Sequence, residues 1–250
     1  MKRGRITLRG GMAPALAVWA ALVTTGSAPA QDAASVASDT AQTASEKPWS
    51  VSGYVGHVTD YVWRGQKLAD DSMQADAAIG AYGLSFDVWL NHSWDDEEVT
   101  ELDYTFSYST TLVDPVNVKF GYIHYTFPNL DEGDNTNEVF AGLSLDTILS
   151  PSFTYYYDWD QGDGSYYNLG VSHSIDTGFH GVSVDLSTGA GYNDSQWGYD
   201  ASFADWLSGL GFTIPIGDYV KFTPAVFASV ALDDQYDDEV YGSFFLKAEY

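Results

Sequence analysis

The final stretch of the chain constrains its fold more than any other. From Val240 to Tyr250, apolar and small residues alternate with mostly polar or charged ones, and the chain ends on an aromatic residue. A period of two is typical of a β-strand with one apolar face. In a closed membrane barrel the last strand pairs with the first, so a terminal strand of this kind has a partner there. A soluble β-sandwich that ends in a strand is the alternative.

Residues 1–30 predict a secretory signal peptide. A basic region precedes a short apolar run, Met12 to Val23, and the small residues Ala28-Pro29-Ala30 form a cleavage site. No later stretch approaches the length of about 20 apolar residues that a spanning helix needs. We therefore expect an exported protein with a flexible lead-in over residues 31–48. If the protein enters a membrane, it must do so as a barrel.

The charge of the exported part excludes several classes of partner. Without residues 1–30, six Lys and Arg stand against 35 Asp and Glu, which gives a formal charge of −29. No basic patch is available for nucleic acid, so we expect no nucleic-acid partner. The chain has no cysteine. An exported fold without disulfides fits a large hydrogen-bonded barrel, and we expect no cofactor.

From Trp49 onward, alternating segments of roughly ten residues are separated by turn residues, the signature of a barrel. We therefore predict an all-β fold, a closed antiparallel up-and-down transmembrane β-barrel over residues 49–250. The template gives about twelve strands, although ten or fourteen also fit the pattern. The tenth is the weakest, because Asp205 and Trp206 break its alternation. The predicted strands are 49–64, 72–81, 84–92, 101–112, 116–125, 138–145, 152–159, 166–175, 182–192, 199–214, 219–231 and 239–250.

The connections alternate between short turns and longer acidic loops. Tyr82-Gly83 and Asp114-Pro115 are short, whereas 65–71, 93–100, 127–137 and 233–238 are longer and acidic. In bacterial barrels the short turns face the periplasm and the longer loops face outside, so both termini are expected in the periplasm.

The acidic loops could suggest a divalent metal site, because carboxylates are the ligands that Ca²⁺ and Mg²⁺ prefer. None of the loops matches an EF-hand, so we expect a solvated rim beside lipopolysaccharide and no metal site. No Gly-x-Ser-x-Gly motif occurs, and four of the five histidines share the lipid-facing parity. We therefore predict no catalytic residues, and an outer-membrane enzyme is the third hypothesis for function.

The opposite parity carries charged residues that would line a lumen. The candidate pore-lining residues are Asp60, Arg64, Asp87, Asp103, Lys119, Asp185, Lys221, Lys247 and Glu249. Rings of charge set selectivity in pores, but the same ions could pair across a narrow barrel and block it. Both readings remain open here. For Arg64, the only arginine after the signal peptide, we expect a structural salt bridge.

The segment Val58-Thr-Asp-Tyr-Val-Trp-Arg-Gly65, with Gln74 and Gly83 to Trp89, resembles the opening of the TorF-type porin family, the Gcw_chp group of conserved outer-membrane proteins. The residues Glu101-Leu-Asp-Tyr and Tyr155-Tyr-Tyr-Asp158 also resemble that family, whereas Gln66-Lys67-Leu68 departs from its usual pattern. The resemblance implies an outer-membrane barrel with a pore.

We therefore expect a porin-like channel in the outer membrane of a Gram-negative bacterium. Small solutes would diffuse passively through a narrow polar lumen. Its partners would be outer-membrane lipid, lipopolysaccharide and the barrel assembly machinery. The alternative is a non-conducting structural or adhesive barrel with acidic extracellular loops.

Overall fold

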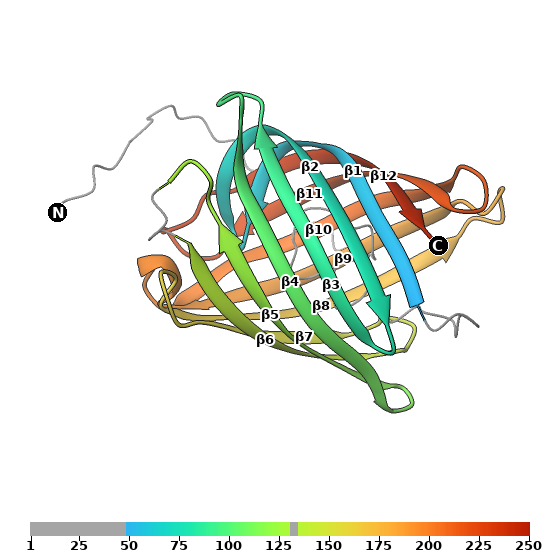
Figure 1. Cartoon of the computed structure of the whole chain (residues 1–250), viewed down its shortest axis with the longest axis horizontal. Helices are drawn as coiled ribbons and strands as arrows, with labels where there is room; N and C mark the ends of the chain where they lie inside the picture. Colours follow the sequence, from blue (N-terminus) through green and yellow to red (C-terminus); the bar gives the residue numbers. More distant parts are fainter. Residues whose placement is uncertain (1–48, 131–134) are drawn as a thin grey trace.

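A computed structural model describes residues 49–130 and 135–250, so the predicted signal peptide and lead-in lie outside the described residues. The chain forms a closed barrel in which each strand pairs antiparallel with its sequence neighbours (Figure 1). This confirms the predicted fold class and the predicted number of strands. The strands are β1 (Trp49–Trp63), β2 (Gln66–Ala81), β3 (Leu84–Ser93), β4 (Glu98–Val113), β5 (Val116–Thr126), β6 (Thr136–Leu145), β7 (Ser152–Asp158), β8 (Gly164–Asp176), β9 (Ser183–Asp194), β10 (Ser202–Pro215), β11 (Val220–Ala231) and β12 (Glu239–Glu249).

In the part of the chain that the structure describes, no helix has both the length and the apolar character to cross a membrane.

The barrel closes between its first and last strands, as the final stretch predicts. The pairing of β1 with β12 runs from Ser52 opposite Glu249 to Val58 opposite Ser243. Beyond it, Val51 and Tyr250 exchange backbone hydrogen bonds of 3.1 and 2.9 Å. This seam also explains Gly56, because a Cβ there would lie 2.2 Å from the carbonyl oxygen of Phe244. Any larger residue would force the two strands apart.

The two faces of the wall differ as a membrane barrel requires. Outward side chains are apolar, and exposed ones from around the barrel include Val55, Phe86, Phe106, Phe120, Leu143, Phe153, Leu169, Phe212, Val226 and Leu246. Inward positions are polar, and buried ones include Gln74, Asn91, Asp103, Thr154, Asn168 and Asp185. Outward aromatic residues meet near both rims: Tyr250 contacts Trp49 and Tyr219, while Tyr122 stacks on Trp159. This pattern fits a hydrocarbon layer with an interface on each side.

We call the rim that holds Trp49 and Tyr250 the terminal end, and the opposite rim the loop end. Residues 82–83, 114–115, 146–151, 177–182 and 216–219 connect strands at the terminal end. At the loop end the connections are 64–65, 94–97, 127–135 (described except for 131–134), 159–163, 195–201 and 232–238. The connection 195–201 includes the short helix η3 (Gln196–Gly198).

The start of β2 and the middle of β10 differ from a regular alternating strand pattern. Residues 65–71 were expected to form a loop, but β2 already begins at Gln66, so the prediction was wrong there. The broken alternation in the tenth strand is real and is a β-bulge, because the pairing with β9 shifts between Phe203 and Trp206. The extra residue keeps Asp205 inside the barrel and Trp206 outside.

Candidate functional site

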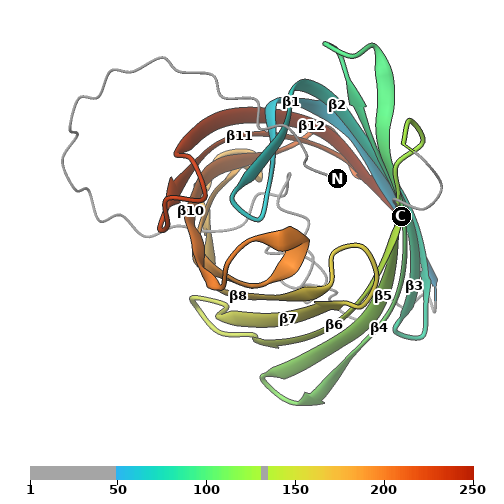
Figure 2. The same cartoon turned by 90° about the vertical axis from the view of Figure 1, so that its left-hand side faces the viewer.

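The end of the β1–β2 hairpin leaves the barrel wall and enters the lumen. Strand β1 pairs with β12 only as far as Val58, and β2 pairs with β3 only from Ser72 onward. Between these points the two strands pair with each other. We call residues 59–71 the hairpin tip. In Figure 2 this cyan end of the hairpin, and the orange segment around η3, lie inside the outline of the barrel.

Local sequence explains the shape of the hairpin tip. Arg64 and Gly65 have φ values of 50° and 77°, and positive values at both central residues are the pattern of a two-residue type I′ turn. Gly65 is also required by close approach, because a Cβ there would lie 3.2 Å from side-chain atoms of Asp205 and Tyr236. Tyr61, Val62 and Trp63 are all buried in succession, since the lumen encloses both faces of this short ribbon.

At its turn the hairpin tip places a charged side chain against the far wall of the barrel. Arg64 Nη1 donates to Glu138 Oε2 at 2.7 Å, and Nη2 donates to Oε1 at 2.9 Å. Glu138 lies on β6, almost opposite β1 in the closed ring of strands. Both side chains are almost completely buried, at 1% and 0% exposed. The expected salt bridge of Arg64 is confirmed, although its near neighbour Asp60 pairs with Lys67 instead.

Further groups complete the surroundings of this ion pair. Gln196 of η3 accepts from Arg64 at 2.7 Å and donates to Glu138 at 2.8 Å. Tyr125 donates to Glu138 at 3.1 Å. The guanidinium carbon lies 4.4, 4.3 and 4.7 Å from the ring centres of Trp63, Tyr156 and Tyr166. These distances are within the range of cation–π attraction.

We call Glu138, Gln196, Tyr125, Tyr156 and Tyr166 together the Glu138 site. Its five members come from β6, η3, β5, β7 and β8. None of the five belongs to the β1–β2 hairpin: four lie on wall strands, and Gln196 lies in the connection between β9 and β10.

The hairpin tip contacts most of the circumference of the lumen. The Tyr61 hydroxyl donates to Glu101 of β4 at 2.9 Å, and its ring centre lies 5.5 Å from that of Trp89. Trp63 meets Tyr125 of β5 with ring centres 6.2 Å apart. Together with the contacts of Arg64 and Gly65, these interactions reach from β3 to β10. The hairpin tip therefore occupies the lumen at this level.

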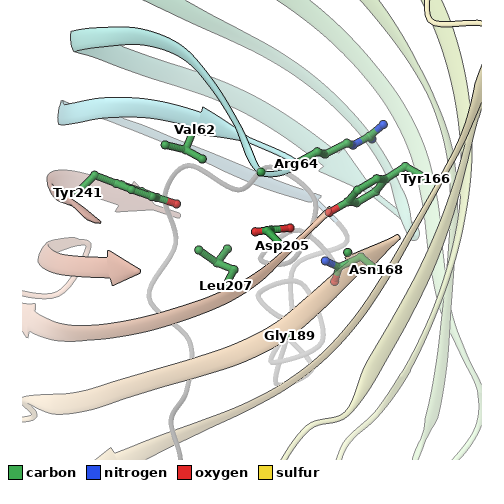
Figure 3. Close-up of a pocket in the computed structure, with 10 residues that line it drawn as sticks. Val62, Arg64, Tyr166, Asn168, Gly189, Asp205, Leu207 and Tyr241 are labelled. Atoms are coloured by element: carbon green, nitrogen blue, oxygen red, sulfur yellow. The ribbon is translucent and has the colours of Figure 1, made fainter. Parts of the chain in front are cut away.

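A small cavity of about 20 Å³ lies beside the turn of the hairpin, and its lining includes Arg64, Asn168, Asp205 and Tyr241. Figure 3 shows Tyr166 beside the Arg64 side chain, with its hydroxyl directed toward Asp205. That hydroxyl bonds to Asp205, which also accepts from Ser229 at 2.8 Å. A second buried carboxylate thus lines the same small cavity as Arg64. The space is large enough for one water molecule.

The loops above the hairpin tip are held by stacked aromatic rings. Tyr199 and Tyr236 have ring centres 4.9 Å apart and an interplanar angle of 12°. Burial is the main cause that raises the pKa of each hydroxyl, and the negative charge of Asp237 adds to the effect on the pKa of Tyr199. Among residues 49–130 and 135–250, no group of three or more His, Cys, Asp or Glu side chains is placed to hold a metal ion.

The nine candidate pore-lining residues fall into three places. Asp60 and Arg64 belong to the hairpin tip. Asp103 and Lys119 are buried inside the wall, and Asp87 is half-buried and accepts from Ser85. The remaining four lie toward the terminal end. Asp185 is buried and accepts hydrogen bonds from Ser174, Ser183 and Thr213. Lys247 is half-buried near the Tyr54 ring, whereas Lys221 and Glu249 are exposed and 3.4 Å apart.

The residues that bind Arg64 are not among the nine candidate pore-lining residues. Glu138 has the inward parity of β6, so the sequence allows it a lumen position but does not indicate Arg64 as its partner. Gln196 lies in a connection and carries no sequence signal. The consecutive apolar residues Tyr61 to Trp63 were the available clue, because a run without alternation indicates burial on both faces.

Comparisons with known proteins agree with this architecture. The KdgM porin is 10% identical, and the match covers 80% of this chain and 98% of the porin with a TM-score of 0.50. The COG4313 outer membrane channel from Pseudomonas putida F1 is also 10% identical, with 84% and 98% covered and a TM-score of 0.52. At such identities the likeness shows a shared fold alone. A search of curated proteins finds no match.

The model of a family described as "Bacterial protein of unknown function (Gcw_chp)" matches residues 41–238. This range includes the hairpin tip and the Glu138 site. It also includes the segments on which the resemblance to the Gcw_chp group rests. The chain therefore belongs to the Gcw_chp family.

Proposed function

We propose that this protein is an outer-membrane channel for passive diffusion of small solutes, and that the conformation described here is its closed state. The observation that carries the proposal is the combination of a polar, charged lumen with a blocking segment that is not part of the wall. The strand pairing of the hairpin tip is with itself, and its two end residues also accept hydrogen bonds from neighbouring elements, Thr59 from Gly242 at 3.0 Å and Asp71 from Trp94 at 2.9 Å. The tip can therefore leave the lumen without breaking the pairing of β1 with β12. A polar lumen with a displaceable segment serves conduction, whereas a purely structural barrel needs neither.

The orientation of the barrel in the membrane follows from its short turns and its acidic loops. We place the terminal end in the periplasm and the acidic loop end outside, beside lipopolysaccharide, as in other bacterial barrels with short periplasmic turns. The closing strand β12, which ends beside Tyr250, is the segment we assign to recognition by the barrel assembly machinery. The outward apolar side chains contact lipid.

The second candidate is a non-conducting structural or adhesive barrel, and the filled lumen at the level of the hairpin tip favours it. Planar-bilayer recordings separate the two candidates. For a channel, we expect brief openings of the wild-type protein and frequent openings of Arg64→Ala, which loses the contact with Glu138. If neither protein shows conductance steps, while both are folded by circular dichroism and heat-modifiable gel mobility, the channel proposal is wrong.

A further inference from the structure

The Glu138 site has the chemistry of a binding site for a guanidinium group, and the protein's own Arg64 fills it. The carboxylate meets the guanidinium through two parallel hydrogen bonds of 2.7 and 2.9 Å. Gln196 supplies a third acceptor at 2.7 Å. Such a fork matches a planar cation with several donors and matches an ammonium ion poorly.

The aromatic members of the site also favour a guanidinium group over an ammonium ion. Tyr156 and Tyr166 place their ring centres 4.3 and 4.7 Å from the guanidinium carbon. A flat, weakly hydrated cation can lie against both rings while its edge bonds to the carboxylate. Trp63 is a third ring, but it leaves with the hairpin. Without the hairpin, the wall therefore keeps two rings and the carboxylate, and η3 keeps the amide of Gln196.

The electrostatic surroundings also favour a cation. Asp205 lies on the hydroxyl side of Tyr166, and Glu101 lies within the lumen under Tyr61. Acidic connections surround the loop end, and the exported part of the chain carries a formal charge of −29. A cleft lined by one sign of charge concentrates ions of the opposite sign, so cations arriving from the loop end are enriched at this site.

We propose that the Glu138 site binds small organic cations that carry a guanidinium group, and that Arg64 is an internal occupant which such a solute displaces. This assignment of a substrate class rests on the proposed channel function for its biological use, but the binding itself does not require conduction. Binding at the Glu138 site and seating of the hairpin tip exclude each other. A guanidinium solute therefore both enters the site and releases the hairpin that blocks the lumen.

Isothermal titration calorimetry in detergent tests the binding, with methylguanidinium as the probe and methylammonium at equal ionic strength as the comparison. Arg64→Ala should bind methylguanidinium at least tenfold more tightly than methylammonium. Adding Glu138→Gln should abolish that preference. Asp218→Asn, which changes an exposed carboxylate on a turn at the terminal end, is the matched control and should leave the preference intact. Equal binding of the two probes by Arg64→Ala overturns the proposal.

A second measurement covers the case in which Arg64→Ala does not fold. The chain has no cysteine, so Val62→Cys introduces a single thiol at a buried position of the hairpin tip. In this otherwise wild-type protein, methylguanidinium at tens of millimolar should speed maleimide labelling at least fivefold, and methylammonium should not. Tethered groups compete at effective concentrations in the millimolar range, which is why the probe must be this concentrated. A labelling rate that methylguanidinium does not change, or that both cations change equally, contradicts the proposal that the Glu138 site binds guanidinium solutes.

The outcome separates this proposal from the channel proposal. Selective binding without any conductance in bilayers leaves the site standing and removes the channel. Conductance without a preference for guanidinium supports the channel and rules out the proposed binding site.

Discussion

Replacing Arg64 by alanine is the most informative perturbation of this barrel, because it removes the group that holds the hairpin tip against the far wall. Glu138 would remain fully buried without its cation. Removing one partner of a buried ion pair costs about 3–5 kcal/mol. Tyr125 and Gln196 still donate to the carboxylate, which limits the loss to the lower part of that range, about 3 kcal/mol.

This loss applies to the seated hairpin and not to the wall, since β1 and β12 keep their pairing. At 1.36 kcal/mol for each factor of ten, about 3 kcal/mol raises the population of the released hairpin roughly a hundredfold. Maleimide labelling of Val62→Cys, which is 3% exposed when the hairpin is seated, reports that population directly. We expect about hundredfold faster labelling in Arg64→Ala and a matching increase in channel open probability.

Lys221→Ala provides the control, because it removes a cation from an exposed pair, 3.4 Å from Glu249 at the terminal end. Labelling of Val62→Cys in this variant should stay within twofold of wild type. If labelling in Arg64→Ala also changes by less than fivefold, the ion pair with Glu138 does not hold the hairpin in the lumen.

Three further predictions concern other parts of the molecule. Changing Lys119, Lys221 and Lys247 to Gln should move the reversal potential in a salt gradient toward cation preference, since it removes positive charge from the lumen and its terminal mouth; an unchanged potential would exclude these lysines from selectivity. Gly56→Ala should destabilise the barrel by about 1–3 kcal/mol in urea unfolding, because its Cβ meets the Phe244 carbonyl at 2.2 Å, whereas Gly170→Ala, with 3.5 Å to its nearest atom, should cost much less. The stacked Tyr199 and Tyr236 should ionise later than ordinary tyrosines in an absorbance titration. Because burial raises both pKa values, their contribution to stability is complete below the ordinary pKa of about 10 and is lost as the pH rises through the raised values. A titration unchanged by Tyr236→Phe would contradict this.

Local pattern was enough to determine the wall of the barrel. Alternation predicted strands such as β4, where Asp103 and Ser107 face inward while Tyr104 and Phe106 face outward. Period-two patterning works here because successive wall residues point alternately to the outer surface and to the lumen, so the polarity of a residue reports its direction. The closing pairing of β12 with β1 followed from the same rule, as did the inward positions of Lys119 and Asp185.

The sequence did not determine what fills the lumen, and this was decided by tertiary structure. The hairpin tip bends at Val58, where β1 leaves β12, and brings Arg64 to a carboxylate 74 residues away in the chain. No local sequence pattern predicts this contact, because the pairing of Arg64 with Glu138 depends on the curvature and closure of the whole barrel. Gln196 and the rings of Tyr156 and Tyr166 join them only because β6, β7, β8 and η3 converge on the same level of the lumen. The sequence by itself thus determined a closed β-barrel with a polar interior, and the three-dimensional arrangement decided that a segment of the first hairpin occupies that interior.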